Sequence, residues 1–219
     1  MLSNSEICWM KILVVAATKL EIVPFLKMNT AAEVLTCGVG IPASVYHLTK
    51  KLLREKYDIV IQAGIAGSFS KKIKKGEVVI VEKDVFGDIG VEEKKIFKSL
   101  FQIGLQQENE FPFTKGWLIN SCEIIQRFTH LKHVKAITVN KIVTRKKYTN
   151  QLKKCFNADI ETMEGAAFHF VCLEQNVPFL QIRSISNKVG ERDKSKWKIK
   201  IAVENLNKEL IKIVDLINK

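Results

Sequence analysis

The sequence predicts an α/β fold, in which a central mixed sheet lies between two layers of helices as a three-layer α/β/α sandwich. Short apolar runs rich in Val and Ile, such as residues 12–17 and 58–63, indicate strands that are buried on both faces. Longer amphipathic segments alternate with these runs, as at residues 42–55. This alternation is typical of a sheet that helices cover on both sides.

One domain is expected. The chain of 219 residues is long enough for one sizeable core, and no Pro/Gly-rich linker, repeat or low-complexity tract divides it. We therefore predict a single domain over residues 10–219, and an N-terminal extension outside the fold at residues 1–9.

Each predicted element follows from its own stretch of residues. Strands are expected where short apolar runs occur, at residues 12–17, 34–37, 58–63, 76–84, around 117, 135–143 and 179–186. Helices are expected from near Lys19 and at residues 42–55, 119–128, 148–156, 163–175 and 197–218. Glycines predict turns in "GVG" (38–40) and "AGIAGSF" (63–69), because glycine tolerates backbone conformations that other residues avoid. Residues 84–115 show no regular pattern.

Composition excludes several classes of protein. No apolar run reaches the roughly 18 residues of a membrane span, and the first residues lack the layout of a secretory signal. Five scattered cysteines without a CxxC pair favour a reduced, cytoplasmic protein. His130 and His133 have no Cys or acidic partner at a zinc spacing, so no metal site is expected.

The formal net charge of +12 has two interpretations. A basic surface could bind nucleic acid, and that function would show steeply salt-dependent binding. However, the excess is mostly Lys in segments such as "KKIKK" and "DKSKWKIK", without the interleaved Arg and aromatic residues of a base-stacking groove. A solvated lysine-rich surface, without nucleic acid as a partner, is the preferred interpretation.

The segment "GVGIPA" (38–43) also fits the dinucleotide-binding pattern formally. That fingerprint requires an acidic residue at the end of the following strand. Asp58 lies at the start of that strand instead, so a simple tight turn is preferred.

Polar residues follow buried strands in four places, where α/β sheets usually place their sites. These are Glu21, the segment "AGIAGSF", the pair Met163-Glu164 and the segment "RSISN" (183–187). Glu164 stands where the apolar helix of "ETMEGAAFHF" begins. Its carboxylate either complements the positive end of that helix or holds a polar group in a pocket. Glu21 allows the same two interpretations.

The segments "MKILVVAATKLE", "QAGIAGSF", "TMEGAAFHFVC" and "NVPFLQIRSISN" resemble, in order and spacing, the nucleoside phosphorylase/nucleosidase superfamily from Met10 onward. Within it, "FGDIGVEE" (86–93) and "SNKVGERDKSKW" (186–197) look most like the futalosine hydrolases. This resemblance implies cofactor-free hydrolysis of a purine nucleoside, futalosine, to hypoxanthine and dehypoxanthine futalosine in a menaquinone pathway. It also implies a homodimer.

The resemblance implies roles for individual residues. Glu21 matches the general base that activates water. Arg183 matches a residue near this water and near the purine base. Glu164 matches the residue that grips the ribose hydroxyls, and Met163 would line the apolar face of the sugar. Further contacts are expected from Ile142 against the purine, from backbone N–H groups around Ala66 and Gly67 near the water, and from Ser186.

Two departures from the superfamily pattern bear on the substrate. Adenine-directed nucleosidases have Asp at the position of Asn187. An amide donor and acceptor side by side suit O6 and a protonated N7 of a 6-oxopurine, so Asn187 favours hypoxanthine over adenine. Ile65 replaces a Ser in "AGIAGSF", and no arginine follows the first strand, which favours hydrolysis over phosphorolysis.

Two other members of the superfamily remain alternatives, a 5'-methylthioadenosine/S-adenosylhomocysteine nucleosidase and a purine nucleoside phosphorylase. The aromatic carboxylate on the 5′ side of futalosine needs a polar or cationic partner. Lys19, Arg145 and Arg192 are candidates, and the sequence does not choose among them.

Overall fold

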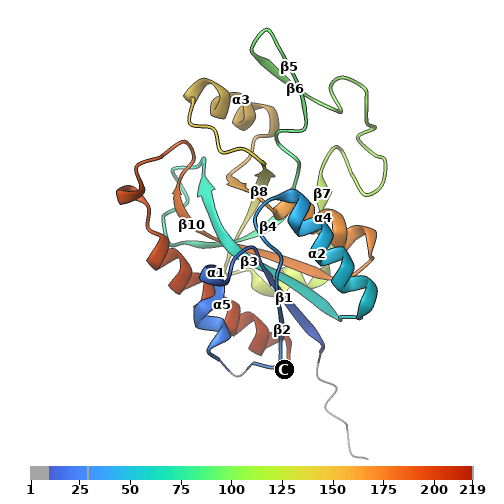
Figure 1. Cartoon of the computed structure of the whole chain (residues 1–219), viewed down its shortest axis with the longest axis vertical. Helices are drawn as coiled ribbons and strands as arrows, with labels where there is room; N and C mark the ends of the chain where they lie inside the picture. The colour runs from blue at the N-terminus through green and yellow to red at the C-terminus, as the bar shows by residue number, and fades with distance from the viewer. Residues whose placement is uncertain (1–9, 29, 219) are drawn as a thin grey trace, which may run out of the picture.

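The computed structural model describes residues 10–28 and 30–218 and shows an α/β fold with helices on both faces of a mixed sheet (Figure 1). The predicted fold class is confirmed. The extension predicted at residues 1–9 lies outside the described residues. Within residues 10–28 and 30–218, no helix combines the length and the apolar character that crossing a membrane requires.

The elements follow one another from Ile12 to Ile217. The strands are β1 (Ile12–Ala16), β2 (Glu33–Thr36), β3 (Ile59–Ser68), β4 (Val78–Asp84), β5 (Gly90–Glu93), β6 (Ile96–Ser99), β7 (Leu118–Ile119), β8 (Lys132–Thr138), β9 (Ile160–Thr162) and β10 (Phe179–Lys188). The α-helices are α1 (Lys19–Leu26), α2 (Ile41–Arg54), α3 (Lys146–Phe156), α4 (Gly165–Glu174) and α5 (Ile199–Ile217). Two 3₁₀ helices are η1 (Glu123–Phe128) and η2 (Lys194–Lys196).

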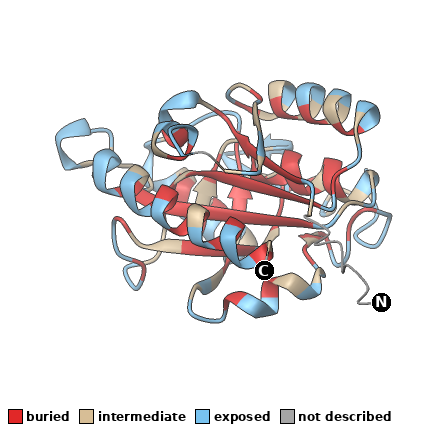
Figure 2. Cartoon of the chain, turned by 90° about the horizontal axis from the view of Figure 1, so that it is seen from below, coloured by how far each residue is buried: buried red, intermediate tan, exposed pale blue. Residues whose placement is uncertain are grey.

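Strand β1 explains why the fold has three layers. All five of its residues are buried. Successive side chains of a strand point to opposite faces, so Ile12 and Val14 pack in a core with α1 and α5, whereas Leu13 and Val15 pack in another core with α2 and α4. Figure 2 shows these buried strands between helices whose outer faces are exposed.

The sheet curls on itself. Its order is β10-β4-β8-β9-β3-β1-β2, and β10 also pairs with β3, so that five strands close into a ring. The long strand β3 is parallel to β1 and β10 and antiparallel to β9. An irregularity between Ile185 and Asn187 bends β10 at its end, as β-bulges do. The sequence predicted the mixed sheet but not this closure.

The turn predicted at "AGIAGSF" is wrong, because β3 continues through it to Ser68. Its glycines serve close packing instead. A Cβ atom at Gly64 would lie 2.1 Å from Nη1 of Arg183, and one at Gly67 would lie 3.1 Å from Cγ2 of Val189. Glycine inside a strand often marks such a close approach.

Other predicted boundaries also shift. The strand predicted to reach residue 143 ends at Thr138, and the helix predicted at 119–128 is only the 3₁₀ helix η1. Helix α4 begins at Gly165 rather than at residue 163. The irregular stretch contains an unpredicted hairpin, β5–β6, which forms a separate two-stranded sheet.

Helix α1 carries Glu21 and is interrupted by Pro24, which has no backbone N–H to continue the helix. Asn207 of α5 reaches into this interruption. Its Nδ2 donates to the carbonyl of Glu21 at 2.8 Å, and its Oδ1 accepts from the N–H of Phe25 at 3.0 Å. These are the two groups that an uninterrupted α-helix pairs with each other. Asn207, only 1% exposed, therefore ties Glu21 to α5.

We predict that Asn207→Leu lowers the free energy of unfolding by about 2–6 kcal/mol, because it leaves two buried backbone groups without their side-chain partner, each worth about 1–3 kcal/mol. Urea unfolding followed by circular dichroism measures this change. Asn205→Leu is the control, since exposed Asn205 makes a single bond, to the carbonyl of Gly76. Equal destabilisation by the two substitutions would contradict the prediction.

Candidate active site

A cavity of about 360 Å³ opens where β1, β3 and β10 end and where α4 begins. The carboxyl ends of parallel strands are the usual place for sites in α/β sheets. Of the residues predicted for the site, the cavity is lined by Glu21, Ala66, Gly67, Ile142, Met163, Glu164, Ser186 and Asn187. Arg183 is not part of this lining. The structure thus brings together residues that are up to 166 positions apart, counted from Glu21 to Asn187 (187 − 21).

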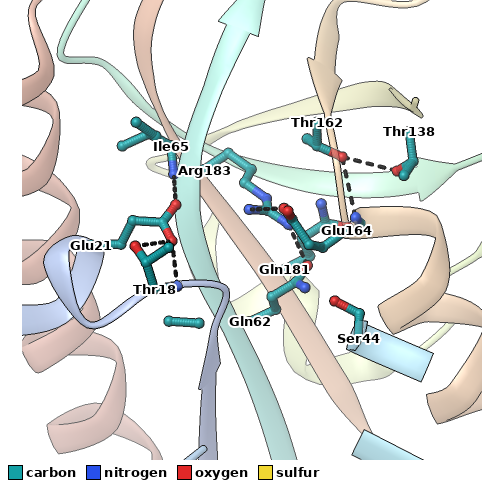
Figure 3. Close-up of polar contacts among 12 residues, drawn as sticks. Thr18, Glu21, Ser44, Gln62, Ile65, Thr138, Thr162, Glu164, Gln181 and Arg183 are labelled. Carbon is teal, nitrogen blue, oxygen red and sulfur yellow. Dashed lines mark hydrogen bonds and ion pairs between the residues drawn. The ribbon is translucent and has the colours of Figure 1, made fainter. Parts of the chain in front are cut away.

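Glu21 is fixed by both oxygens of its carboxylate (Figure 3). Oε2 accepts hydrogen bonds from the N–H and the hydroxyl of Thr18 at 3.0 and 3.1 Å, and Oε1 accepts one from the N–H of Ile65 at 3.0 Å. The bond to the Thr18 N–H belongs to a capping box at the start of α1. Glu21 therefore stabilises the helix start, as the first interpretation predicted, and it also lines the cavity.

Glu164 is the residue before α4, yet its side chain makes no hydrogen bond to that helix. Its Oε1 instead accepts from the N–H of Gly40 at 3.0 Å. Gly40 has a φ of 89°, which favours glycine. The N–H of Gly40, in the segment "GVGIPA", is thus already bonded to a carboxylate. This agrees with the preference for a simple turn over a dinucleotide-binding loop at this segment. Burial raises the pKa of the Glu164 carboxyl, and Arg183 and the Gly40 N–H oppose that shift.

The start of α4 is held by threonines instead. Gly165 N–H donates to the hydroxyl of Thr162 at 3.2 Å, and Ala166 N–H donates to the hydroxyl of Thr138 at 2.7 Å. Free N–H groups at a helix start need such acceptors. Because threonines of β8 and β9 satisfy them, the carboxylate of Glu164 stays available to the cavity.

Arg183 lies behind the cavity wall and is 1% exposed. Its Nη2 donates to Oε1 of Gln62, and its Nη1 lies 3.9 Å from Oε2 of Glu164. The guanidinium passes against Gly64, where an added Cβ would also lie 3.0 Å from Oε1 of Glu21. Arg183 was predicted near the water and the purine. The structure places it behind both carboxylates, where it can orient them.

Asn187 lies at the bent end of β10 and has an ordered amide. Its Oδ1 accepts from the hydroxyl of Ser186 at 2.7 Å, and its Nδ2 donates to the carbonyl of Lys188 at 2.9 Å. The same hydroxyl lies 3.2 Å from the carbonyl of Ala66. Each amide group can make one more hydrogen bond, so both a donor and an acceptor remain for a ligand.

Ile142 and Met163 supply apolar surface. Ile142 is 41% exposed and lies on the loop after β8 rather than on a strand. Asp88 holds this loop, because its Oδ2 accepts from the N–H groups of Asn140 and Lys141 at 2.6 and 3.3 Å. Met163 lies next to Glu164 in the cavity wall. Both side chains suit the faces of flat, apolar rings.

The charge of the lining contrasts with that of the whole chain. The described residues that line the cavity include four glutamates, Glu21, Glu161, Glu164 and Glu191, and no Lys or Arg. None of the cations considered for a 5′ carboxylate, which are Lys19, Arg145 and Arg192, belongs to the lining. A chain of net charge +12 thus encloses an acidic cavity, which suits a ligand that carries or develops positive charge.

The sequence interpretation missed several residues of the lining. Glu161 lies two residues before the predicted Met-Glu pair. Trp197 directly follows η2, and Ile199 and Val203 belong to α5. The apolar Ile199 stands 43% exposed at the start of an amphipathic helix. In the sequence Ile199 fits the apolar stripe of this helix, three residues before the buried Ala202, so the pattern gave no signal of a ligand surface there.

Comparison with known proteins identifies the family of the chain. The family model described as Phosphorylase superfamily matches residues 26–217. A futalosine hydrolase of Thermus thermophilus is 28% identical over 181 residues, which cover 81% of this chain and 79% of that protein. A 5'-methylthioadenosine/S-adenosylhomocysteine nucleosidase of Buchnera aphidicola is also 28% identical, over 190 residues that cover 78% of this chain and 69% of that protein.

Solved structures share the fold. The native futalosine hydrolase of Helicobacter pylori superposes with a TM-score of 0.80 at 20% identity, covering 95% of this chain and 98% of that chain. A 5'-methylthioadenosine/S-adenosylhomocysteine nucleosidase of the same organism gives 0.79 at 21% identity, covering 95% and 99%. Since the family model matches residues 26–217, which is well over half of the chain, the chain belongs to the phosphorylase superfamily.

Proposed function

We propose that the chain is a nucleosidase that hydrolyses the N-glycosidic bond of futalosine and releases hypoxanthine and dehypoxanthine futalosine, a step of menaquinone biosynthesis. The observation that carries the hydrolysis in this proposal is the acidic lining without Lys or Arg among the described residues, whereas futalosine as the substrate rests on Asn187. Breaking an N-glycosidic bond develops positive charge on the ribosyl ring, as in glycoside hydrolysis. Nearby carboxylates stabilise that charge. A phosphate co-substrate would require cations in the same place.

In this proposal Glu21 is the general base. Its two oxygens are already held by Thr18 and by the Ile65 N–H, so the carboxylate is oriented before water arrives. A positioned general base typically contributes about 100- to 10,000-fold to the rate. Backbone groups at Ala66 and Gly67 border the same part of the cavity.

Glu164 binds the ribose diol in this proposal. One of its oxygens is bonded to the Gly40 N–H and the other lies near Arg183, so that its orientation is fixed while it retains further acceptor sites. Met163 packs against the sugar from the neighbouring position. Arg183 acts as a positioning residue, because its guanidinium contacts Glu164 rather than the cavity.

The choice of base depends on Asn187. Its free donor and acceptor match O6 and a protonated N7 of hypoxanthine. The relatives do not decide which base is released. A futalosine hydrolase and a 5'-methylthioadenosine/S-adenosylhomocysteine nucleosidase both share 28% sequence identity with the chain. Adenine-type nucleosides are therefore the second candidate substrate.

We also propose a homodimer. The hairpin region near residues 86–93, which we expect at its interface, exposes the apolar side chains of Ile89, Val91 and Ile96. An interface there would bury these residues and border the loop that Asp88 holds beside the cavity.

The first functional prediction concerns the released base. Purified protein incubated with futalosine in phosphate-free buffer should release hypoxanthine, detected by chromatography, at a rate that added phosphate does not change. The same protein should release little adenine from 5'-methylthioadenosine. Adenine release without hypoxanthine release would reject futalosine as the substrate. A strict requirement for phosphate would identify a phosphorylase instead.

The two carboxylates should differ in the kinetic parameter that they affect. Glu21→Gln should lower kcat about 100-fold or more with little change in KM, since it removes the general base. Glu164→Gln should raise KM more than it lowers kcat, since it weakens a charged hydrogen bond to the ribose. Thermal unfolding of both variants checks that the fold is kept. A Glu21→Gln enzyme with near-native kcat would show that another group activates water.

Asn187→Asp should shift the preference toward 6-aminopurine nucleosides, because a protonated carboxyl can donate to N7 whereas the donor for O6 is lost. The ratio of kcat/KM for futalosine to that for 5'-methylthioadenosine should fall at least about tenfold, the equivalent of one hydrogen bond. Ser186→Ala provides a comparison, since it removes only the hydroxyl that orients the amide. An unchanged ratio in Asn187→Asp would refute the assigned contacts.

A further inference from the structure

Asp84 is a buried carboxyl group that the mechanism proposed above does not use. It ends β4, is 0% exposed and is not part of the cavity lining. Its Oδ1 accepts hydrogen bonds from the N–H of Val85 at 2.8 Å and from the hydroxyl of Thr138 at 3.0 Å. Among the described residues, the one donor to its Oδ2 is Nε2 of Gln181, at a long 3.4 Å. A buried carboxyl group with so few donors requires an explanation.

The hydroxyl of Thr138 connects Asp84 to the start of α4. A hydroxyl has one hydrogen atom, and Thr138 gives it to Asp84. The hydroxyl of Thr162, 2.9 Å away, must therefore donate to Thr138 (Figure 3). Both threonine oxygens are then left as acceptors for the helix, and they bind the N–H groups of Ala166 at 2.7 Å and Gly165 at 3.2 Å. Asp84 thus sets the direction of these hydrogen bonds.

Asp84 also approaches the helix start at Gly165. A Cβ atom on Gly165 would lie 2.2 Å from Oδ2 of Asp84 and 2.3 Å from Nε2 of Gln181. Both side chains therefore pack against the bare backbone of this residue. Gly165 directly follows Glu164, to which we assign the ribose diol. Because protein interiors are close-packed and transmit displacements, the position of Asp84 is coupled to the backbone that carries Glu164.

A buried histidine beside Gln181 indicates which protonation state of Asp84 fits. Nδ1 of His169 lies 3.0 Å from the carbonyl of Leu118, which can only accept, so Nδ1 carries the hydrogen. Burial lowers the pKa of His169 to about 4, and Gln181 is among the groups that oppose this shift. The neutral ring therefore offers Nε2 as an acceptor. Neither this Nε2 nor Oε1 of Gln181 has a partner among the described residues.

Rotation of the Gln181 amide by half a turn would give both atoms a partner. This rotation exchanges the positions of the amide oxygen and nitrogen. Oε1 of Gln181 would then accept from a protonated Oδ2 of Asp84. Nε2 of Gln181 would donate to Nε2 of His169 on the other side. The protonated acid therefore satisfies buried groups that the ionised carboxylate leaves without partners.

A neutral Asp84 also suits the charges around it. The guanidinium of Arg183 on β10 is the charge that acts on Asp84, and the ring of His169 on α4 is the other titratable group nearby. Burial raises the pKa of the Asp84 carboxyl to about 7, and Thr138 and then Arg183 oppose this shift. When Asp84 is protonated, the positive charge of Arg183 is left for Glu164 and need not balance a further buried carboxylate.

We propose that Asp84 is a positioning residue, whose protonated carboxyl group fixes the start of α4 and thereby the carboxylate of Glu164. It accepts from Thr138 and donates to Gln181. This inference rests on the proposed function, since it assigns the group that holds the ribose-binding residue in place. Asp84 does not line the cavity. Its loss should therefore weaken binding of the ribose through Glu164 and leave binding of the free purine unchanged.

The test compares Asp84→Leu and Asp84→Asn with the full-length wild type at pH 6, where the acid form of Asp84 predominates. Asp84→Leu should raise KM for futalosine about 10- to 100-fold, as expected for a buried polar group left unpaired. The dissociation constant of hypoxanthine, measured by calorimetry, should not change. Asp84→Asn should keep both values, because its amide accepts from Thr138 and donates to Gln181 as the protonated acid does.

A second pair of variants tests the same connection if Asp84→Leu does not fold. Thr138→Val keeps the shape of the side chain but removes the hydroxyl between Asp84 and Ala166. It should raise KM in the same way without a change in hypoxanthine binding. Thr138→Ser keeps the hydroxyl and is the matched control. Thermal unfolding of all four variants checks that the fold is kept.

Three results would overturn the inference. The first is an unchanged KM in Asp84→Leu and Thr138→Val. The second is a loss of hypoxanthine affinity equal to the rise in KM, as a merely structural role would produce. The third is a KM in Asp84→Asn as high as that in Asp84→Leu, which would show that the ionised carboxylate is required.

Failure of the proposed function looks different, because the wild type would then release no hypoxanthine from futalosine. If the wild type releases adenine from 5'-methylthioadenosine instead, the same comparison is made with that nucleoside and with adenine. Both nucleosides carry the ribose diol that we assign to Glu164. The role of Asp84 is thus tested whichever base is released.

Discussion

The buried guanidinium of Arg183 is the interaction on which the site depends. A buried charge is stable only with partners. Here Gln62 and Glu164 supply them, and Gly64 provides the space through which the side chain approaches Glu21. The cation behind the wall allows two carboxylates to stand close together in a half-enclosed cavity. Without it their mutual repulsion and desolvation would favour protonation of one of them.

Charge is segregated between the inside and the outside of the molecule. Lys and Arg total 35 against 23 Asp and Glu in the chain, yet the described lining of the cavity has four glutamates and neither Lys nor Arg. A basic surface attracts anions. The acidic interior suits the positive charge of a ribosyl transition state. The net charge of the sequence therefore describes the surface and not the site.

Closure of the sheet gives the cavity its shape. Strand β3 pairs with both β9 and β10. In this register Gly67 of β3 pairs with Asn187 of β10 on one side and with Glu161 of β9 on the other, so these three residues are neighbours across three strands. The amide end of Asn187 is fixed by Ser186, and Glu21 is fixed by the capping box of its own helix and by Asn207. Elements that stabilise the fold thus also orient the groups of the site.

The sequence by itself determined where most strands lie, though not β5, β6 and β9, as well as the three layers and the strand-end position of Glu21, Glu164 and Asn187. These follow from local apolar periodicity and from polar residues that interrupt it. Only the tertiary structure decided that Arg183 lies behind the wall, that Glu161 faces the cavity and that lysines avoid it. Periodicity reports whether a side chain is buried. Which buried or half-buried side chains share a cavity depends on the pairing register of strands far apart in sequence, and no local pattern contains that information.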